Sequence, residues 1–328
     1  MKGGFDVKLG IFTVLFSSMP FEEMLDHVAA AGVDAVEIGT GGYPGNAHCD
    51  REALLASAEK RSAFLQAVTS RGLEISALSC HNNPLHPNAE VRQKADQELR
   101  ETIRLAAELG VKTVVTFSGC PGESDQSQNP VWVTCPWPEE YSRVLEWQWK
   151  EKVIPYWTEL NRFAAQHGVR IAIEAHPGFV VYNGETLLRL REACGEQIGI
   201  NFDPSHMFWQ GIDPVEAVHA LAPHRCIFHV HAKDTGFNKR NVARDGVLDT
   251  KPYREELKRA WIFRTVGYGH DHETWADLLS ALQMNGYDGV ISIEHEDSLM
   301  SIEEGFQKAV AFLRPLVIRE KLQQMWWA

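Results

Sequence analysis

Short runs of β-branched and small apolar residues alternate with amphipathic stretches along the whole chain, and this alternation constrains the fold most strongly. Each apolar run has the length of a buried parallel strand, and several amphipathic runs end on glycine, which closes a helix at little steric cost. Eight of these runs are expected to be strands: residues 8–14, 35–40, 74–80, 113–118, 170–175, 198–203, 227–232 and 289–294.

Eight strands that alternate with helices predict an α/β fold, a (β/α)8 TIM barrel, which we expect residues 1–328 to form as one domain. A chain of 328 residues with 44% hydrophobic residues can build such a barrel, although two ordinary domains would also fit the length. A doubly wound sheet is the alternative. It would place its ligand at one switch point, whereas here polar residues end nearly every strand.

Two long segments interrupt the alternation. Residues 119–152 follow the fourth predicted strand and are rich in proline and tryptophan, and residues 235–264 follow the seventh and are polar and charged. Loops of this length usually act as lids or binding loops, and on a barrel both would rise from the rim where the strands end. We expect the first to cover the barrel mouth. Packing against neighbouring helices or a partner subunit is the alternative.

Four predicted strands end on a side chain that binds metal ions. A barrel places its chemistry at the carboxyl ends of its strands, so side chains that end strands five to eight are expected to converge. A helix cap or surface charge would explain one such residue better than four on neighbouring strands. These four are Glu174, Asp203, His231 and Glu294.

The composition of this group indicates which metal it prefers. Strand alternation turns both His229 and His231 inward, and His231 is favoured as the ligand because it lies nearer the rim. Two glutamates, one aspartate and one histidine suit Mn2+, Mg2+ or Co2+, whereas Zn2+ is less favoured without more histidine or thiolate. We expect one divalent ion, with Mn2+ preferred.

Composition also narrows the partners and the compartment. A net charge of −12 disfavours nucleic-acid binding, and no apolar run approaches the roughly 20 residues that span a bilayer. Six cysteines without CxxC pairs suit reduced thiols, which predicts a cytoplasmic protein. A homo-oligomer is possible, and the C-terminal Trp326 and Trp327 are expected to dock on the body or on a second subunit.

The strings IEAHPG, NFDPSH, HVHAKD and GYDGVISIEHED occur in this order and resemble the xylose isomerase-like TIM-barrel superfamily. That superfamily includes sugar isomerases, ketose 3-epimerases, inosose-processing enzymes and endonuclease IV. The resemblance implies that Glu174, Asp203, His231 and Glu294 ligate the metal, and that His206 contacts the substrate or assists the metal. It also implies that Glu174 and Glu294 remove and return a proton beside a carbonyl, while the cation stabilises the enediolate.

Several other residues are candidates for substrate binding, each with a structural alternative. Glu37 and His81 end strands two and three, and His81 could instead cap or pack. His176 could pack within its loop, and Lys233 could pair with Asp234. Trp132 and Trp137 could stack on a sugar face or cover a neighbour's site. The glycine-containing stretch at residues 267–272 could hold an anion at a helix N-terminus.

The predicted function is therefore a metal-dependent isomerase or epimerase of a small carbohydrate, either a sugar, a keto-sugar or a sugar phosphate. The alternatives are a lyase or hydrolase acting on a keto-glycoside or cyclitol, an abasic-site nuclease like endonuclease IV, and a barrel that binds sugar without catalysis. The nuclease is disfavoured because the fourth strand ends on Ser118 rather than on a histidine.

Overall fold

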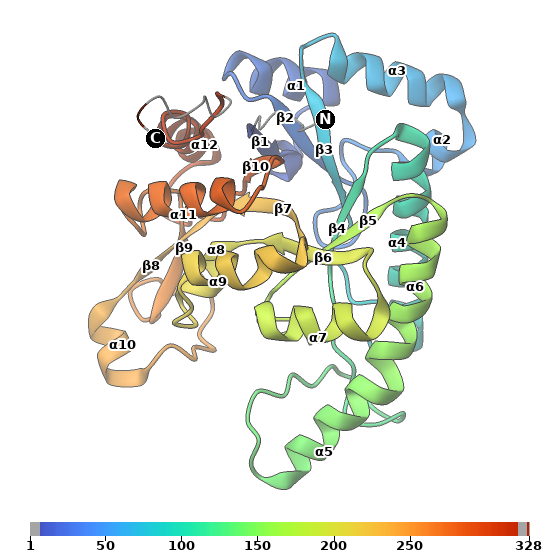
Figure 1. Cartoon of the computed structure of the whole chain (residues 1–328), viewed down its shortest axis with the longest axis vertical. Helices are drawn as coiled ribbons and strands as arrows, with labels where there is room; N and C mark the ends of the chain where they lie inside the picture. Colours follow the sequence, from blue (N-terminus) through green and yellow to red (C-terminus); the bar gives the residue numbers. More distant parts are fainter. Residues whose placement is uncertain (1–6, 321–326, 328) are drawn as a thin grey trace.

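The computed structural model describes residues 7–320 and 327 and contains a closed barrel of eight parallel strands (Figure 1). Neighbouring strands around the barrel follow the order β1, β10, β7, β6, β5, β4, β3, β2, and the (β/α)8 prediction is confirmed. The barrel strands are β1 (Lys8–Phe12), β2 (Ala35–Gly39), β3 (Glu74–Ser79), β4 (Thr113–Phe117), β5 (Arg170–Glu174), β6 (Ile198–Phe202), β7 (Ile227–Ala232) and β10 (Val290–Ile293).

Helices connect the strands and surround the barrel (Figure 1). Many begin at a side chain that accepts a backbone N–H; Asn88, for example, accepts from Glu90 and Val91 at the start of α4. The α-helices are α1 (Phe21–Ala30), α2 (Arg51–Ala56), α3 (Ala58–Thr69), α4 (Ala89–Leu109), α5 (Glu139–Trp147), α6 (Ile154–Gln166), α7 (Gly184–Cys194), α8 (Pro204–Phe208), α9 (Pro214–Leu221), α10 (Lys239–Asp245), α11 (His272–Met284) and α12 (Ile302–Leu313). Two 3-10 turns, η1 (Thr13–Phe16) and η3 (Ala222–His224), and a π-helix, η2 (Gln148–Val153), complete the set.

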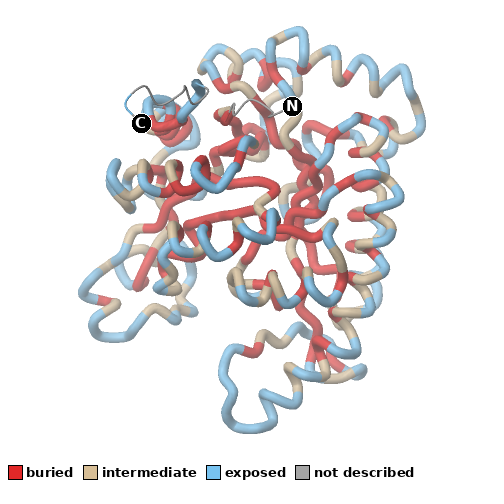
Figure 2. The backbone as a smooth tube through the Cα atoms, viewed as in Figure 1, coloured by how far each residue is buried: buried red, intermediate tan, exposed pale blue. Residues whose placement is uncertain are grey.

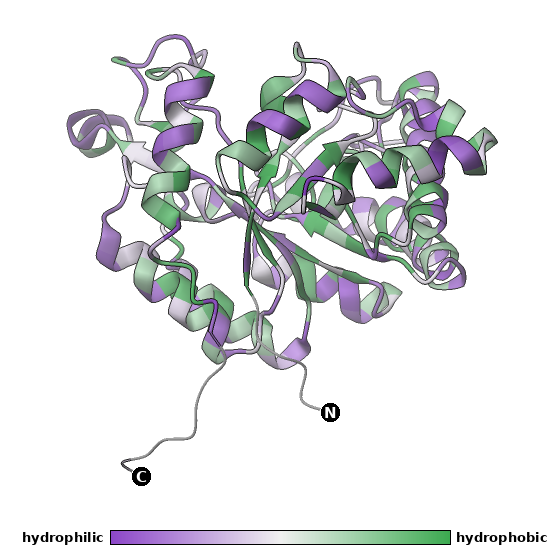
Figure 3. Cartoon of the chain, turned by 90° about the horizontal axis from the view of Figure 1, so that it is seen from above, coloured by the Kyte–Doolittle hydropathy of each residue, from purple (hydrophilic) through white to green (hydrophobic). Residues whose placement is uncertain are grey.

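The barrel strands are buried on both faces, which explains why the sequence shows nearly continuous apolar runs rather than alternation (Figure 2). Residues of β2 and β6 are buried throughout. Figure 3 shows hydrophobic residues along the strands and a mixture of hydrophilic and hydrophobic residues along the helices around them. A cluster of buried polar side chains lies where the strands end, and it forms the site described below.

The first insertion extends from the end of β4 and carries α5 away from the barrel (Figure 1). Its base is tied by the buried amide of Gln148 in η2, whose Nε2 donates to the carbonyl groups of Gly122 at 3.1 Å and Val131 at 2.7 Å. The segment is therefore ordered at its base by hydrogen bonds to a helix that precedes α6.

The second insertion is more structured than the polar loop that the sequence indicated. Strands β8 (Asp234–Phe237) and β9 (Trp261–Arg264) pair antiparallel, and α10 lies between them in the chain. Pairing of these short strands depends on contacts between residues 24 to 30 positions apart, which a local pattern does not reveal.

Two further sequence expectations concern the surface and the C-terminus. Within residues 7–320 and 327, no helix is long and apolar enough to cross a membrane. Trp326 lies outside the described residues, and Trp327 is 70% exposed.

Candidate active site

The four predicted metal ligands come together at the carboxyl end of the barrel. Glu174 is the last residue of β5, His231 lies in β7, and Asp203 and Glu294 directly follow β6 and β10. One ligand atom from each lies within 4.8 Å of all the others. The strands that carry them are neighbours in the barrel, which is why four distant sequence positions share one centre.

Three atoms of this ligand group lack a hydrogen bond in the described part of the chain, although all three are buried: Asp203 Oδ2, His231 Nδ1 and Glu294 Oε2. His231 Nδ1 lies 3.3 Å from Glu174 Oε2 and 3.0 Å from Glu294 Oε2. The two carboxylate oxygens are ion-paired with Lys233, at 3.2 and 3.0 Å, but a buried polar atom without a hydrogen bond is costly, and a cation held between the three atoms would give each of them a further partner. The donor set of three carboxylates and one imidazole fits a divalent ion.

Asp203 serves the fold and the ligand group with different oxygens. Its Oδ1 accepts from the backbone N–H of Ser205 at 2.8 Å and caps the N-terminus of α8, and its Oδ2 faces the ligand group. A helix cap and a metal ligand were competing interpretations of this residue in the sequence. In the structure the two are compatible, and the cap fixes the orientation of the carboxylate.

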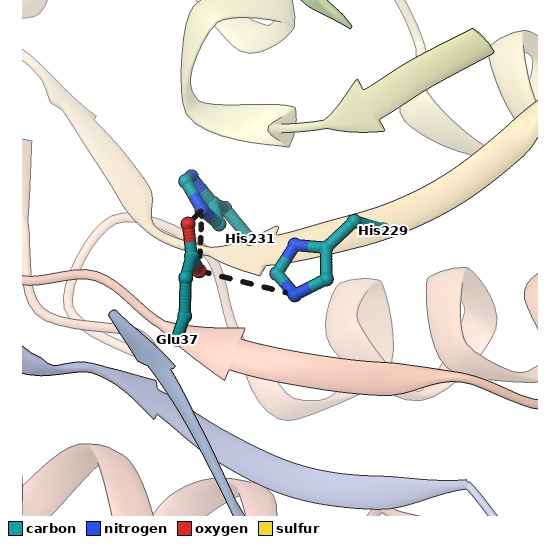
Figure 4. A group of neighbouring side chains, drawn as sticks. All are labelled: Glu37, His229 and His231. Atoms are coloured by element: carbon teal, nitrogen blue, oxygen red, sulfur yellow. Dashed lines mark hydrogen bonds and ion pairs between the residues drawn. The ribbon is translucent and has the colours of Figure 1, made fainter. Parts of the chain in front are cut away.

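Glu37 holds the ring of His231 in place (Figure 4). His231 Nε2 lies 2.9 and 3.0 Å from the two Glu37 oxygens, while Ser79 and Ser292 donate to the same carboxylate. Burial would raise the pKa of Glu37, but the charges of His231 and His229 outweigh it and lower the pKa to about 2. An ionised partner at Nε2 keeps a proton there. Burial would lower the pKa of His231, but the charges of Glu37 and Glu294 outweigh it and hold the pKa well above its usual range, so without an ion the ring also carries a proton at Nδ1, which a bound cation would displace.

This arrangement differs from the substrate contact that the sequence suggested for Glu37. The residue is 0% exposed, and its oxygens are used by His231 and two serines. The sequence interpretation placed Glu37 at the end of the second strand, whereas the residue lies in the middle of β2. The imidazole that it contacts lies 194 positions away in the chain, so the pattern alone did not reveal the pairing.

His229 lies one layer deeper than His231, as strand alternation predicts (Figure 4). Its Nδ1 lies 3.0 Å from Asn201 Oδ1 and its Nε2 lies 3.3 Å from Ser76 Oγ. Burial lowers the pKa of His229 to about 4, so the ring is neutral at pH 7. Glu37, His229 and His231 are close enough to hold an ion, but hydrogen bonds already satisfy the Glu37 and His229 side chains.

Glu174 is surrounded by donors. His81 Nε2 lies 2.9 Å and Asn201 Nδ2 3.0 Å from Oε2, and His206 Nε2 lies 3.1 Å from Oε1. Burial would raise the pKa of Glu174, but these neighbours, His81 first, outweigh it and hold the pKa well below its usual range. His81, expected either to contact substrate or to fill a core position, is therefore buried against a metal ligand.

Lys233 lies between β7 and β8, and its ammonium group contacts the ligand group. Its Nζ lies 3.2 Å from Asp203 Oδ2, 3.0 Å from Glu294 Oε2 and 3.1 Å from Glu296 Oε2, and the side chain is 2% exposed. The suggested pairing of Lys233 with Asp234 is wrong, because the Asp234 carboxylate instead accepts hydrogen bonds from the backbone of residues 267–270 and from the indole of Trp275. The ammonium group is instead ion-paired with two of the predicted metal ligands and with Glu296.

The glycine-containing stretch at residues 267–272 does form an anion-binding loop, but its anion is part of the chain. Backbone N–H groups of Gly267, Gly269 and His270 donate to Asp234 Oδ2 at 3.0, 3.1 and 3.0 Å. The indole of Trp275 also donates to this oxygen, at 3.2 Å. These donors are therefore not available for a substrate phosphate.

A cavity of about 240 Å³ adjoins the ligand group. It is lined by Trp132, His176, Pro177, Gly178, His206, Trp209, Leu248, Asp249, Thr250, Tyr253, Trp261 and Phe263. Both candidate histidines, His176 and His206, line this cavity, and the centroids of their rings are 4.1 Å apart. Of the two tryptophans proposed to stack on a sugar, Trp132 lines the cavity, whereas Trp137 does not and is 75% exposed.

The aromatic part of this site was not predicted from the sequence. Tyr253, Trp261 and Phe263 lie among charged residues in the second insertion, so the sequence pattern did not indicate that they line one cavity. Asn201 and Ser79 were also not assigned a role. The inward position of Asn201 beside Asp203 was the signal that could have identified it.

Comparison with known proteins shows the family of the chain. Residues 25–316 match the sequence model of the family described as "Xylose isomerase-like TIM barrel". The chain belongs to this family. It is 38% identical to the uncharacterized protein YfiH of Bacillus subtilis (strain 168) over 314 residues, which are 95% of this chain and 99% of that protein.

Two solved structures share the fold of this family member. A D-tagatose 3-epimerase-like protein has a TM-score of 0.62 at 22% identity, covering 94% of this chain and 98% of its own. The 3-keto-D-glucoside 4-epimerase YcjR of E. coli has a TM-score of 0.63 at 16% identity, covering 94% and 100%. At these identities the likeness shows the barrel architecture alone.

Proposed function

We propose that the protein is a metal-dependent epimerase or isomerase that removes a proton beside the carbonyl of a keto-sugar and returns it. The observation that carries this proposal is the convergence of Glu174, Asp203, His231 and Glu294, with three buried atoms that lack hydrogen bonds. Family membership and the epimerase names of two structural neighbours support it.

A divalent ion at this group would stabilise the negative charge that develops on the carbonyl oxygen as the proton leaves. We propose that one divalent ion binds here and that Mn2+ is preferred, because hard oxygen ligands outnumber the single imidazole. The free thiols of the chain, five of them buried, are compatible with a reducing cytoplasm.

Side chains of the protein then remove and return the proton. Glu174 is held by His81, Asn201 and His206, so its carboxylate has a fixed position from which to remove or return a proton. Glu294 is the second carboxylate and is 12% exposed at its side chain, which leaves it open toward a bound substrate. Lys233 lies between Asp203 and Glu294 and supplies a cation for a substrate oxygen.

Solvent exchange tests this function even when the product is not known. The Mn2+-loaded protein is incubated in deuterium oxide with ketoses, keto-glycosides, inososes and sugar phosphates, and NMR detects deuterium at the carbon beside the carbonyl. We expect exchange with one substrate class, and we expect Glu174→Gln and Glu294→Gln to abolish it even at an Mn2+ concentration raised until each variant is loaded with metal. Glu159→Gln is the control, since the Glu159 side chain on α6 is 68% exposed, pairs with Arg100 and is not part of the ligand group.

The same spectra separate the competing reactions. An inverted centre indicates epimerisation, a shifted carbonyl indicates isomerisation, and loss of a group indicates elimination. Exchange that persists in both glutamine variants would contradict the assignment of the two carboxylates. Exchange with no substrate class would contradict the proposed function itself.

A further inference from the structure

We propose that the aromatic cavity beside the metal ligands binds the second ring of a glycoside, so that the substrate is a keto-glycoside carrying a ring-shaped aglycone rather than a free ketose. This inference rests on the proposed function, because it assigns the reacting sugar to the metal-ligand group. The second ring is either another sugar or an aromatic group, since both present a flat face.

The cavity is placed to receive a group attached to the reacting sugar. His206 lies between the two regions: its Nε2 is 3.1 Å from Glu174 Oε1 and 3.2 Å from Asp203 Oδ2, and the residue also lines the cavity. Phe263 lines it as well, and Lys233 Nζ lies 4.7 Å from the centre of its ring. None of the four metal ligands is among the described residues that line it, so the cavity is adjacent space rather than the reaction centre.

The wall of the cavity is built from flat aromatic rings. Trp209 and Trp261 stack with centroids 4.6 Å apart at 9°, and Tyr253 and Phe263 stack at 5.7 Å and 22°. Aromatic faces bind rings with little loss of side-chain freedom, and their polar edges suit a partly hydrated ligand. Tyr253 is 55% exposed and Trp132 is partly exposed, so two of these side chains remain accessible to a ligand.

Both insertions contribute to this wall. Trp132 belongs to the first, and Tyr253, Trp261 and Phe263 belong to the second. Contacts within the second insertion fix its rings: the Arg259 guanidinium lies 4.4 Å from the ring centre of Tyr253 and 4.8 Å from that of Trp261. Because these rings are held in place before a ligand binds, binding loses less free energy in ordering the side chains. This favours a ligand subsite over an incidental gap between loops.

Unreactive glycosides test the cavity independently of catalysis. The full-length, Mn2+-loaded protein is titrated by NMR with methyl β-D-glucoside, phenyl β-D-glucoside and cellobiose, and with methyl β-D-galactoside, phenyl β-D-galactoside and lactose. In at least one series we expect a ligand with a second ring to bind at least tenfold more tightly than its methyl counterpart. A preference for phenyl indicates an aromatic aglycone, and a preference for the disaccharide indicates a second sugar.

Two variants that alter the cavity wall and one control variant from the same insertion serve this test. Trp132→Ala and Tyr253→Ala should each remove the preference for a second ring, whereas Trp137→Ala, five positions along the same insertion, should retain it. Thermal melting and Mn2+ binding verify that each variant is folded. No preference in either series, or a preference that survives both Trp132→Ala and Tyr253→Ala, would overturn the proposal.

The result of the glycoside titration can be distinguished from the result of the solvent-exchange experiment that tests the proposed function. A second-ring preference without deuterium exchange would leave the subsite standing and remove the assigned chemistry. Exchange with free ketoses and no second-ring preference would support the chemistry and overturn the subsite.

Discussion

At the level of single residues, the positions of side chains at the ends of predicted strands indicated the ligand group, but they did not indicate the contacts that support it. The positions of Glu174, Asp203, His231 and Glu294 followed from their place at the ends of four strands. The roles of their partners depend on the registers of distant strands, as with Glu37 in β2 and His231 in β7. Such pairs are invisible to a pattern that extends over a few residues.

The contact between Glu37 and His231 gives a prediction about metal affinity. Glu37→Gln should weaken Mn2+ binding by about 10- to 100-fold, because the amide can donate to Nε2 and shift the ring proton to Nδ1, the atom that faces the ligand group. Isothermal titration measures the affinity, and nitrogen NMR of the metal-free protein, recorded as the pH is raised until the ring of His231 is neutral, reports its tautomer.

Glu159→Gln serves as the exposed control for this variant and should bind Mn2+ like the unaltered protein. An unchanged affinity and tautomer in Glu37→Gln would mean that another contact orients the imidazole.

At the level of elements, the eight barrel strands were predictable because each is buried on both faces and bounded by turn residues. Strands β8 and β9 were not, since they are four residues each and gain their order from antiparallel pairing and aromatic contacts. The glycines that follow β9 indicate an anion site, and the sequence alone suggests a ligand as the anion. The anion in the structure is the carboxylate of Asp234, at the start of β8.

That internal anion predicts a large stability cost for Asp234→Ala. The buried carboxylate accepts three backbone N–H groups and an indole, so its removal leaves several buried donors unsatisfied and should cost roughly 3–5 kcal/mol. Asp271→Ala is a control from the same stretch: Asp271 caps α11, and loss of a helix cap costs about 1 kcal/mol. Urea unfolding compares the two, and equal costs would show that the loop does not depend on this carboxylate.

At the level of the whole molecule, the metal ligands connect β5, β6, β7 and β10, which are consecutive around the barrel. An ion at this site would therefore join half of the barrel, whereas its removal leaves three carboxylates close together. The barrel itself followed from the strand count. The course of the insertions did not: α5 extends away from the barrel, while Trp132 in the same insertion reaches the cavity.

This arrangement predicts that the metal stabilises the fold. Mn2+ at 100 times its dissociation constant should add about 2.7 kcal/mol to the free energy of unfolding and raise the melting temperature by a few degrees. Scanning calorimetry with and without a chelator measures the shift, and Asp203→Asn should abolish it. A shift of the same size in that variant would place the stabilising ion elsewhere.

Metal stoichiometry tests the central claim most directly. Metal-stripped protein is titrated calorimetrically with Mn2+, beside the variants Asp203→Asn and Glu294→Gln. We expect one saturable site per chain and a loss of at least about 100-fold in affinity when either ligand is neutralised, because a charged oxygen is removed from the coordination sphere. No saturable binding to the unaltered protein, or undiminished binding to both variants, would contradict a metal centre at Glu174, Asp203, His231 and Glu294.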